Sequence, residues 1–342
     1  METRYLGNSG LKISAFILGN WLTHGAQIED KAAEKCIRTA LDHGIFTFDT
    51  ADVYANGAAE KVLGRVLKDQ DRQDLVIMTK VYWPVKHGGP NDEGLSRKHI
   101  MESIDNSLRR LKTDYVDVYH AHRFDSGTPL EETMVAFADL VRAGKVLYLG
   151  ISDWDAEQIR QAAALARELR VPLISNQPQY SMLWRTPESE GIIQASEENG
   201  LSQICYSPLA QGVLTGKYQP GKTPKDKTRA ASKGGAEMIQ RWMRDDLLSA
   251  VQGLRRVAEE AGCKMNELAL AWLLSRRNVS AAIIGASKPS QIEENLGALR
   301  VSLDDSILAA IDQVLGDFEV SQSPPPAPVV RPRVARSYPR AT

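Results

Sequence analysis

The chain has 342 residues, of which 43% are hydrophobic and 25% charged, the composition of an ordinary globular protein rather than a disordered, collagen-like or coiled-coil chain. Its 42 basic residues balance 43 acidic ones, which excludes the basic excess of a typical nucleic-acid binder. No apolar run approaches the ~18 residues that span a bilayer, and Met1–Arg4 lacks the apolar core of a secretory signal. We therefore expect a cytoplasmic protein with neither a nucleic-acid nor a membrane partner. Three widely spaced cysteines form no disulfide framework or metal pattern, so we expect reduced thiols and no metal site.

The first predicted element is a β-hairpin in Tyr5–Ile13, which turns around Asn8–Gly10. Eight short apolar runs follow, each typical of a strand that is buried on both faces. They are Phe16–Leu18, Phe46–Phe48, Leu75–Met78, Val116–Tyr119, Leu147–Ile151, Leu173–Ile174, Ile204–Tyr206 and Ala281–Ile284. Most of these runs begin about 30 residues apart, which is the length of one strand-plus-helix unit.

Helical patterns fill the intervals between the apolar runs. Apolar residues recur at helical spacing in Ile100–Leu111 and in Met134–Val141. The last interval is much longer than the others. It holds a Lys/Gly/Pro-rich stretch, Lys217–Gly235, and then helical patterns in Leu247–Glu260 and Glu267–Arg276. The seventh strand is therefore predicted to carry an inserted segment.

Strands that alternate with helices indicate an α/β protein with a parallel sheet, and eight such units fit a (β/α)8 TIM barrel. A doubly wound open sheet is disfavoured because no Gly-x-Gly-x-x-Gly motif follows the first strand. We expect the barrel to occupy residues 1–318, with the hairpin closing its floor. Residues 319–342 are predicted to form a disordered, flexible tail, because Val320–Thr342 contains many prolines and arginines and no acidic residue.

Polar residues close several of the predicted strands, where a TIM barrel carries its active site. Asp49 follows the second apolar run, Lys80 the third and His122 the fourth, while Tyr54 lies in the loop after Asp49. A tyrosine hydroxyl, with a pKa of about 10, exchanges protons poorly near pH 7. A nearby ammonium would lower that pKa, a carboxylate would hold the ammonium, and a histidine could bind a carbonyl oxygen. Together these four residues predict a proton donor for carbonyl chemistry.

At these positions the chain resembles the aldo-keto reductase family, over roughly Tyr5 to Leu315. The matching segments are Phe46–Tyr54, Gly57–Gly64, Thr79–Val81, Asp114–Tyr119, Gly144–Ser152, Asn176–Gln177, Tyr206–Gly212 and Ile284–Ser287. Leu214–Tyr218 and the residues Gln291, Glu294 and Asn295 are similar to the bacterial relatives of the potassium-channel β subunits.

The resemblance implies an NADPH-dependent oxidoreductase that reduces aldehydes or ketones to alcohols. Asp49, Tyr54, Lys80 and His122 match the family's catalytic tetrad, in which Tyr54 would be the general acid and His122 would orient the carbonyl. The positions that match cofactor-binding residues are Trp21, Gln27, Ser152, Asn176, Gln177, Tyr206, Ser207, Leu209, Gln211, Gly212, Lys217, Arg229, Ser287, Lys288, Gln291, Glu294 and Asn295. Aromatic residues predicted to line the substrate pocket are Trp21, Tyr82, Trp83 and Trp154.

Two positions depart from the family's patterns. Asp153 stands where the family often has Asn or Arg, so its carboxylate is expected either to weaken a cofactor contact or to point to solvent. His122 stands where the channel β subunits have Asn, which favours a working reductase.

Two other functions remain open at this stage. The chain could be an NADPH-binding regulatory subunit that senses redox state with little turnover, or a barrel lyase that uses Lys80 as a Schiff base. The lyase is disfavoured because an Asp49–Lys80 ion pair would keep the amine charged. The sequence leaves the oligomeric state open, since related proteins form monomers, dimers and larger rings.

Overall fold

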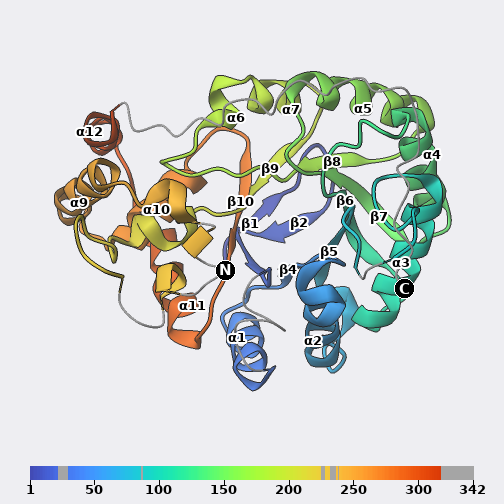
Figure 1. Ribbon diagram of the computed structural model, residues 1–342, viewed down its shortest axis with the longest axis horizontal. Coiled ribbons are helices and arrows are strands. Elements are labelled where there is room, and N and C mark those ends of the chain that lie inside the picture. The colour runs from blue at the N-terminus through green and yellow to red at the C-terminus, as the bar shows by residue number, and fades with distance from the viewer. Residues whose placement is uncertain (22–29, 86–87, 225–227, 232–235, 238, 317–342) are drawn as a thin grey trace, which may run out of the picture.

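The computed structural model describes residues 1–21, 30–85, 88–224, 228–231, 236–237 and 239–316 (Figure 1). Eight parallel strands close into a barrel in the order β10-β3-β4-β5-β6-β7-β8-β9. They are β3 (Phe16–Gly19), β4 (Thr47–Asp49), β5 (Val76–Val81), β6 (Val116–Ala121), β7 (Val146–Ile151), β8 (Leu173–Asn176), β9 (Ser202–Cys205) and β10 (Val279–Ile284). The predicted (β/α)8 barrel is confirmed, although the predicted tail at 319–342 lies outside the described residues.

Helices surround the barrel on its outer side (Figure 1). They include α1 (Asp30–Asp42), α2 (Ala58–Leu67), α3 (Arg97–Leu111), α4 (Leu130–Arg142), α5 (Ala156–Leu169), α6 (Thr186–Ser189), α7 (Ile192–Glu198) and α11 (Pro289–Leu296). The segment after β9 carries α9 (Asp245–Glu260) and α10 (Met265–Leu274), as the helical patterns predicted, and α9 packs against α12 (Asp305–Leu315). Strand side chains that face these helices form one continuous apolar core with them.

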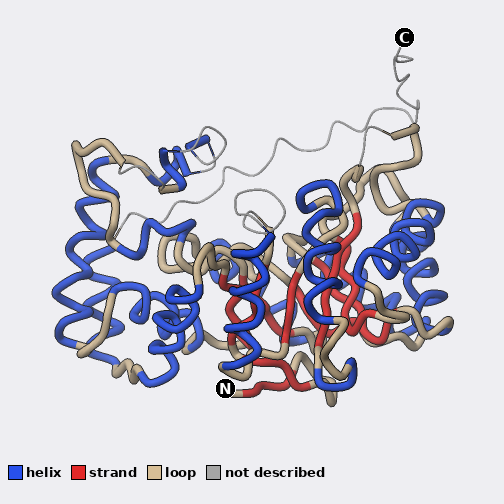
Figure 2. Tube along the Cα trace, turned by 90° about the horizontal axis from the view of Figure 1, so that it is seen from below, coloured by secondary structure: helices blue, strands red, loops and turns tan. Residues whose placement is uncertain are grey.

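A second, smaller apolar cluster fills the inside of the barrel and is closed by the N-terminal hairpin. Strands β1 (Thr3–Tyr5) and β2 (Lys12–Ser14) pair antiparallel, as predicted, and lie at the end of the barrel where the strands begin (Figure 2). Leu6 and Ile13 are completely buried against interior residues such as Ile174. Full burial of each aliphatic side chain contributes about 1.5–3 kcal/mol, so the hairpin is an integral part of the core.

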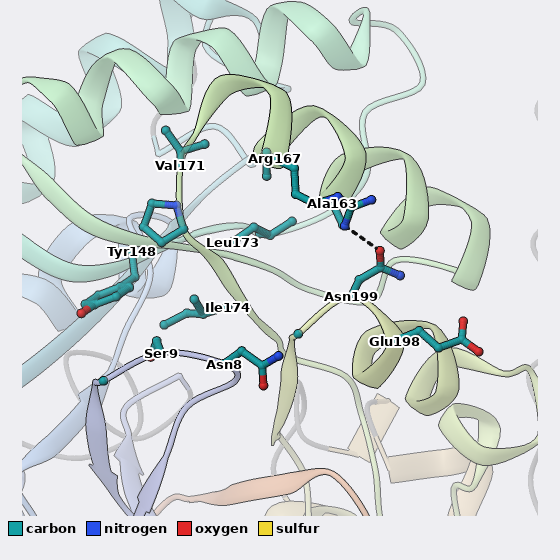
Figure 3. Close-up of a pocket in the computed structure, with 14 residues that line it drawn as sticks. Asn8, Ser9, Tyr148, Ala163, Arg167, Val171, Leu173, Ile174, Glu198 and Asn199 are labelled. Atoms are coloured by element: carbon teal, nitrogen blue, oxygen red, sulfur yellow. Dashed lines mark hydrogen bonds between the residues drawn. The ribbon is translucent and has the colours of Figure 1, made fainter.

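The turn of the hairpin requires glycine. Gly7 has a φ of +54°, and a Cβ at this position would lie 2.3 Å from the carbonyl oxygen of Ile174. Beside the turn, an open groove of about 550 Å3 lies between Asn8, Tyr148 of β7 and Asn199 after α7 (Figure 3). Because this groove is at the amino ends of the strands, it is on the opposite face from the residues predicted to be catalytic.

A buried ion pair joins α2, α3 and β5 beneath the site. Glu60 is fully buried, accepts a 2.6 Å hydrogen bond from Nε of Arg110, and accepts another from the Thr79 hydroxyl. Two glycines of the same motif make room for these contacts. Gly57 has a φ of +83° and lies against the Arg110 side chain, and a Cβ on Gly64 would approach the backbone of α3 within 2.5 Å. These contacts explain why the Gly57–Gly64 segment carries glycine at both ends.

Candidate active site

The four residues predicted to be catalytic meet at the carboxyl ends of neighbouring strands. Asp49 ends β4, Lys80 lies one residue before the end of β5, and His122 directly follows β6. Tyr54 begins a short 3-10 turn, Tyr54–Gly57, in which Ala55 and Asn56 both have positive φ values. This left-handed backbone folds the loop back over the barrel mouth.

Lys80 lies at the centre of the cluster and is completely buried. Its Nζ donates hydrogen bonds to Asp49 Oδ2 at 2.6 Å, to the Thr50 carbonyl at 2.7 Å and to the Tyr54 hydroxyl at 3.2 Å. Three acceptors use all three hydrogens of an ammonium group, which favours the charged amine. Burial lowers the pKa of Lys80, and the Asp49 carboxylate opposes that change.

Tyr54 lies between two aromatic side chains above Lys80. Its ring centroid is 5.7 Å from that of His122, in an edge-on arrangement, and 6.5 Å from that of Trp21. Burial raises the pKa of the Tyr54 hydroxyl well above its ordinary value, and the Asp49 charge raises it further. This differs from the expectation that the nearby ammonium would lower the pKa. The structure therefore presents Tyr54 as a protonated hydroxyl, the form that a proton donor requires.

Both histidines of β6 and its edge are electrically neutral. Burial and the Lys80 charge lower the pKa of His122 well below its ordinary value and that of His120 to about 3. His120 lies one layer deeper, with Nε2 at 3.1 Å from the Ser175 hydroxyl. His122 is 8% exposed, and its Nδ1 has no hydrogen-bond partner among the described residues. His122, rather than His120, can reach a molecule at the mouth.

The predicted cofactor-binding residues of β7 and β8 adjoin this cluster. Gln177 donates a 2.9 Å hydrogen bond to Asp49 Oδ1, and its own carbonyl accepts one from the Ser152 hydroxyl at 2.8 Å. Asn176 donates to the Gln203 side chain at 3.0 Å. The Asn176 Oδ1 atom is buried and lacks a partner in the described part of the chain. A buried, unsatisfied amide oxygen fits the carboxamide NH2 of a nicotinamide ring.

Tyr206 and the loop after β9 form the next wall of the site. The Tyr206 hydroxyl donates to Asp153 at 2.7 Å, and Ser207, Gln211 and Gly212 all have positive φ values. Leu209, at the start of this loop, is half-buried. The exposed Lys217 folds back over Gly212, because a Cβ there would lie 2.7 Å from Lys217 Nζ. This bent loop places backbone and a cation together, as a phosphate site requires.

The remaining predicted cofactor residues lie at the start of α11, beyond β10. Lys288 is the exposed residue before this helix, and Gln291 accepts hydrogen bonds from the Ser287 backbone and hydroxyl. Glu294 is exposed, whereas Asn295 is buried and accepts a 3.0 Å hydrogen bond from Asn266 of α10. Gln27 and the side chain of Arg229 lie outside the described residues. None of these cofactor assignments is tested by a bound group, and they stay predictions.

The predicted pocket aromatics divide into two groups. Trp21 and Trp83 are each 39% exposed at the mouth, and Tyr82 packs edge-on against Trp83 with ring centroids 4.6 Å apart. Trp154 is only 1% exposed and packs edge-on against Phe124. The structure therefore brings three of the four to the opening, while Trp154 lies in the core behind it.

Sequence reasoning missed Arg123 and did not foresee the hydrogen-bond partners of Asp153, whose effect on a cofactor contact stays a prediction. Asp153 neither points freely to solvent nor stands alone beside a cofactor. It accepts from Tyr206 and pairs with Arg123 at 3.1 Å. Their positions in the sequence could have pointed to the site, because Arg123 directly follows His122 and Asp153 directly follows Ser152. Only the closed barrel brings these two strand ends together.

Comparisons with known proteins agree with this geometry. The profile of the Aldo/keto reductase family matches residues 15–315. The chain is 42% identical, over 320 residues, to an Arabidopsis thaliana protein named "Probable voltage-gated potassium channel subunit beta", covering 92% of this chain and 97% of that protein. It is 42% identical, over 304 residues, to a protein of the same name from Oryza sativa subsp. japonica, covering 88% of this chain and 92% of that protein.

The family match thus spans the whole barrel, from the first barrel strand to the last helix, and contains all four residues of the cluster around Lys80. Among the described residues, no helix is both long and apolar enough to cross a membrane. The sequence match and the barrel with its buried Lys80 cluster lead to the same conclusion: the chain belongs to the aldo/keto reductase family.

Proposed function

We propose that this protein is an NADPH-dependent reductase of aldehydes or ketones, with Tyr54 as proton donor. Membership of the family supports an oxidoreductase that uses a nicotinamide cofactor. The observation that carries the proposal is the Asp49–Lys80–Tyr54 chain, with hydrogen bonds of 2.6 and 3.2 Å, beside a neutral His122.

The proposed division of roles follows from these contacts. When bound, NADPH supplies the hydride. The Tyr54 hydroxyl gives its proton to the carbonyl oxygen, and the Lys80 ammonium next to it stabilises the phenolate that is left. Asp49, fixed from its other side by Gln177, keeps that ammonium charged and oriented. His122 offers a neutral imidazole to the same carbonyl oxygen, and the rings of Trp21 and Trp83 limit access of water.

Residues that would hold the cofactor lie along one arc of the barrel mouth. Asn176, Gln177 and Ser152 would bind the carboxamide, and the Tyr206 ring would stack on the nicotinamide. The Ser207–Gly212 loop with Lys217 would hold the pyrophosphate, and the start of α11 the adenosine phosphate, because a helix N-terminus attracts anions.

The test is loss of NADPH absorbance with a panel of small aldehydes, aryl aldehydes, keto sugars and ketones. Steady turnover that disappears in Tyr54→Phe is the expected result. Absence of turnover on every carbonyl, with a well-folded protein, would contradict the proposal.

A second candidate function is an NADPH-binding, redox-sensing regulatory subunit, and the naming of the Arabidopsis thaliana and Oryza sativa relatives as channel subunits favours a regulatory role. In that case the protein would bind NADPH tightly and show little or no turnover on any carbonyl compound. Cofactor binding measured by fluorescence, alongside the turnover assay on the same preparation, separates the two functions.

The lyase alternative has little support. A Schiff base requires a neutral amine that is free to attack a carbonyl, whereas all three hydrogens of Lys80 are taken up by Asp49, Thr50 and Tyr54. Borohydride trapping of a carbonyl compound on Lys80 would revive this alternative.

A further inference from the structure

Asp153 ties together the ends of four neighbouring strands. It directly follows Ser152 at the end of β7 and has a φ of +52°. Its Oδ1 accepts a 3.1 Å hydrogen bond from the backbone N–H of Gln179, just beyond β8. Its Oδ2 accepts a 2.7 Å hydrogen bond from Tyr206, just beyond β9, and pairs at 3.1 Å with Arg123, just beyond β6.

Arg123 lies at the same rim as the catalytic candidates. Its Nη1 donates a 2.6 Å hydrogen bond to the carbonyl of His122 and approaches the Ser152 hydroxyl at 3.5 Å. Burial raises the pKa values of Tyr54 and Tyr82, and the charge of Arg123 partly opposes that rise at both residues. Its side chain is 36% exposed, so a molecule that enters the mouth can contact it.

Among the described residues next to the predicted proton donor, the two cations Lys80 and Arg123 are each paired with a carboxylate. Lys80 is held by Asp49 and is completely buried, and Arg123 is held by Asp153. The same part of the mouth carries the aromatic residues Trp21, Tyr82 and Trp83. A carboxylate on a substrate would lose water on entering this opening and find a guanidinium that is already occupied, which is unfavourable. A neutral substrate has no charged group to desolvate and needs no free cation in the site.

We propose that Asp153 determines substrate specificity. By occupying Arg123 it makes the site select neutral carbonyl compounds over those that carry a carboxylate near the carbonyl. This inference rests on the proposed reductase function and specifies its substrate class. It also implies that removal of the Asp153 charge releases Arg123, whose guanidinium fork is suited to bind a carboxylate.

The experiment compares wild type with Asp153→Asn on matched neutral and anionic substrates. The substrates are 3- and 4-formylbenzoate, each set against its methyl ester, with NADPH. The asparagine removes the negative charge and keeps one acceptor oxygen for the Gln179 N–H, while its NH2 group replaces Oδ2 and can donate to the Tyr206 hydroxyl oxygen. We expect the wild type to favour the esters in kcat/KM, and the ratio of acid to ester to rise at least tenfold in Asp153→Asn.

Two further variants serve as controls. Arg123→Met combined with Asp153→Asn should return the ratio to that of wild type, because the released cation is gone. Asp139→Asn is a matched change on α4, where Asp139 also bonds two arginines, Arg97 at 2.6 Å and Arg142 at 3.1 Å. It should leave the ratio unchanged.

A binding measurement needs no turnover. Calorimetric titration of the cofactor-free protein with benzoate should show at least tenfold tighter binding to Asp153→Asn than to wild type. Equal benzoate affinity in the two proteins would overturn the inference, whatever the kinetics show. If neither protein turns over any substrate and the benzoate affinity still rises, the reductase function fails while the role of Asp153 in occupying Arg123 stands. If both proteins turn over the esters with an unchanged ratio, the specificity role of Asp153 fails while the reductase function stands.

Discussion

Tyr54→Phe is the sharpest test of the catalytic assignment, because it removes one oxygen atom and keeps the ring. The lost hydroxyl accepts a single 3.2 Å hydrogen bond from Lys80, which keeps its shorter bonds to Asp49 and to the Thr50 carbonyl. The loss of one hydrogen bond costs about 1 kcal/mol of folding stability. The ring contact with His122 remains, so the variant should fold.

The effect on catalysis should be far larger than the effect on stability. Loss of a general acid lowers the rate by about 100-fold or more, which corresponds to at least about 2.7 kcal/mol of barrier. NADPH affinity should stay nearly unchanged, since the residues predicted to bind it are other side chains. The assay measures kcat from NADPH absorbance and cofactor affinity from fluorescence.

His120→Ala is the matched control, because His120 lies one layer below the mouth and its Nε2 contacts the Ser175 hydroxyl. It should lower stability and leave most of the turnover, whereas His122→Ala should slow turnover and alter substrate preference. If Tyr54→Phe keeps most of its activity while a folded His120→Ala is inactive, the assignment of the proton donor is wrong.

Three further predictions follow from other contacts. Lys288→Glu should weaken NADPH binding more than NADH binding, because Lys288 is exposed before α11 where a 2′-phosphate could meet it; equal weakening of both would show that Lys288 faces elsewhere. Arg110→Met should lower the free energy of unfolding by about 3–5 kcal/mol in a urea titration, since it strands the buried Glu60 carboxylate; a change below 1 kcal/mol would contradict that view. Burial lowers the pKa of His120 to about 3, whereas a histidine in the unfolded chain has a pKa of about 6.5. Between these two pH values the unfolded chain binds a proton at His120 and the folded chain does not. Stability should therefore fall as pH drops from about 6.5 toward about 3, and the fall in melting temperature should be smaller in His120→Gln; equal slopes would argue against it.

The alternation of apolar runs and helical patterns was enough to predict the barrel, but the strands proved longer than the runs. β5 continues through Thr79 and Lys80 to Val81, and β6 continues through His120 to Ala121. Lys80 and His120 can occupy these strands because their side chains find partners at Asp49 and Ser175, and Thr79 can because its hydroxyl bonds Glu60 on the helix side. A rule based on apolar side chains therefore ends these two strands too early, at the position where the polar residues begin.

Local motifs identified the residues around Lys80, since each follows its own strand, but they could not show which residues pair across the barrel. The Gln177–Asp49 hydrogen bond joins residues 128 positions apart, and Asp153 meets Tyr206 across 53 positions. The direction of the Tyr54 pKa was also beyond the sequence, because it depends on burial and on the Asp49 charge, which outweigh the Arg123 charge in the closed structure.

The floor hairpin has a consequence for the order of events during synthesis. Leu6 and Ile13 leave the ribosome long before other members of the interior cluster that they cover, which includes Ile174, Ile204 and Ile283. β3 likewise cannot complete its pairing in the barrel until β10 has been synthesised, because Ile17 pairs with Ile283. At translation rates of about 5–20 residues per second, this interval is on the order of ten seconds or more. During this interval the apolar side of the hairpin is in contact with solvent or with a chaperone, and the floor of the barrel can be closed only after β10 has emerged.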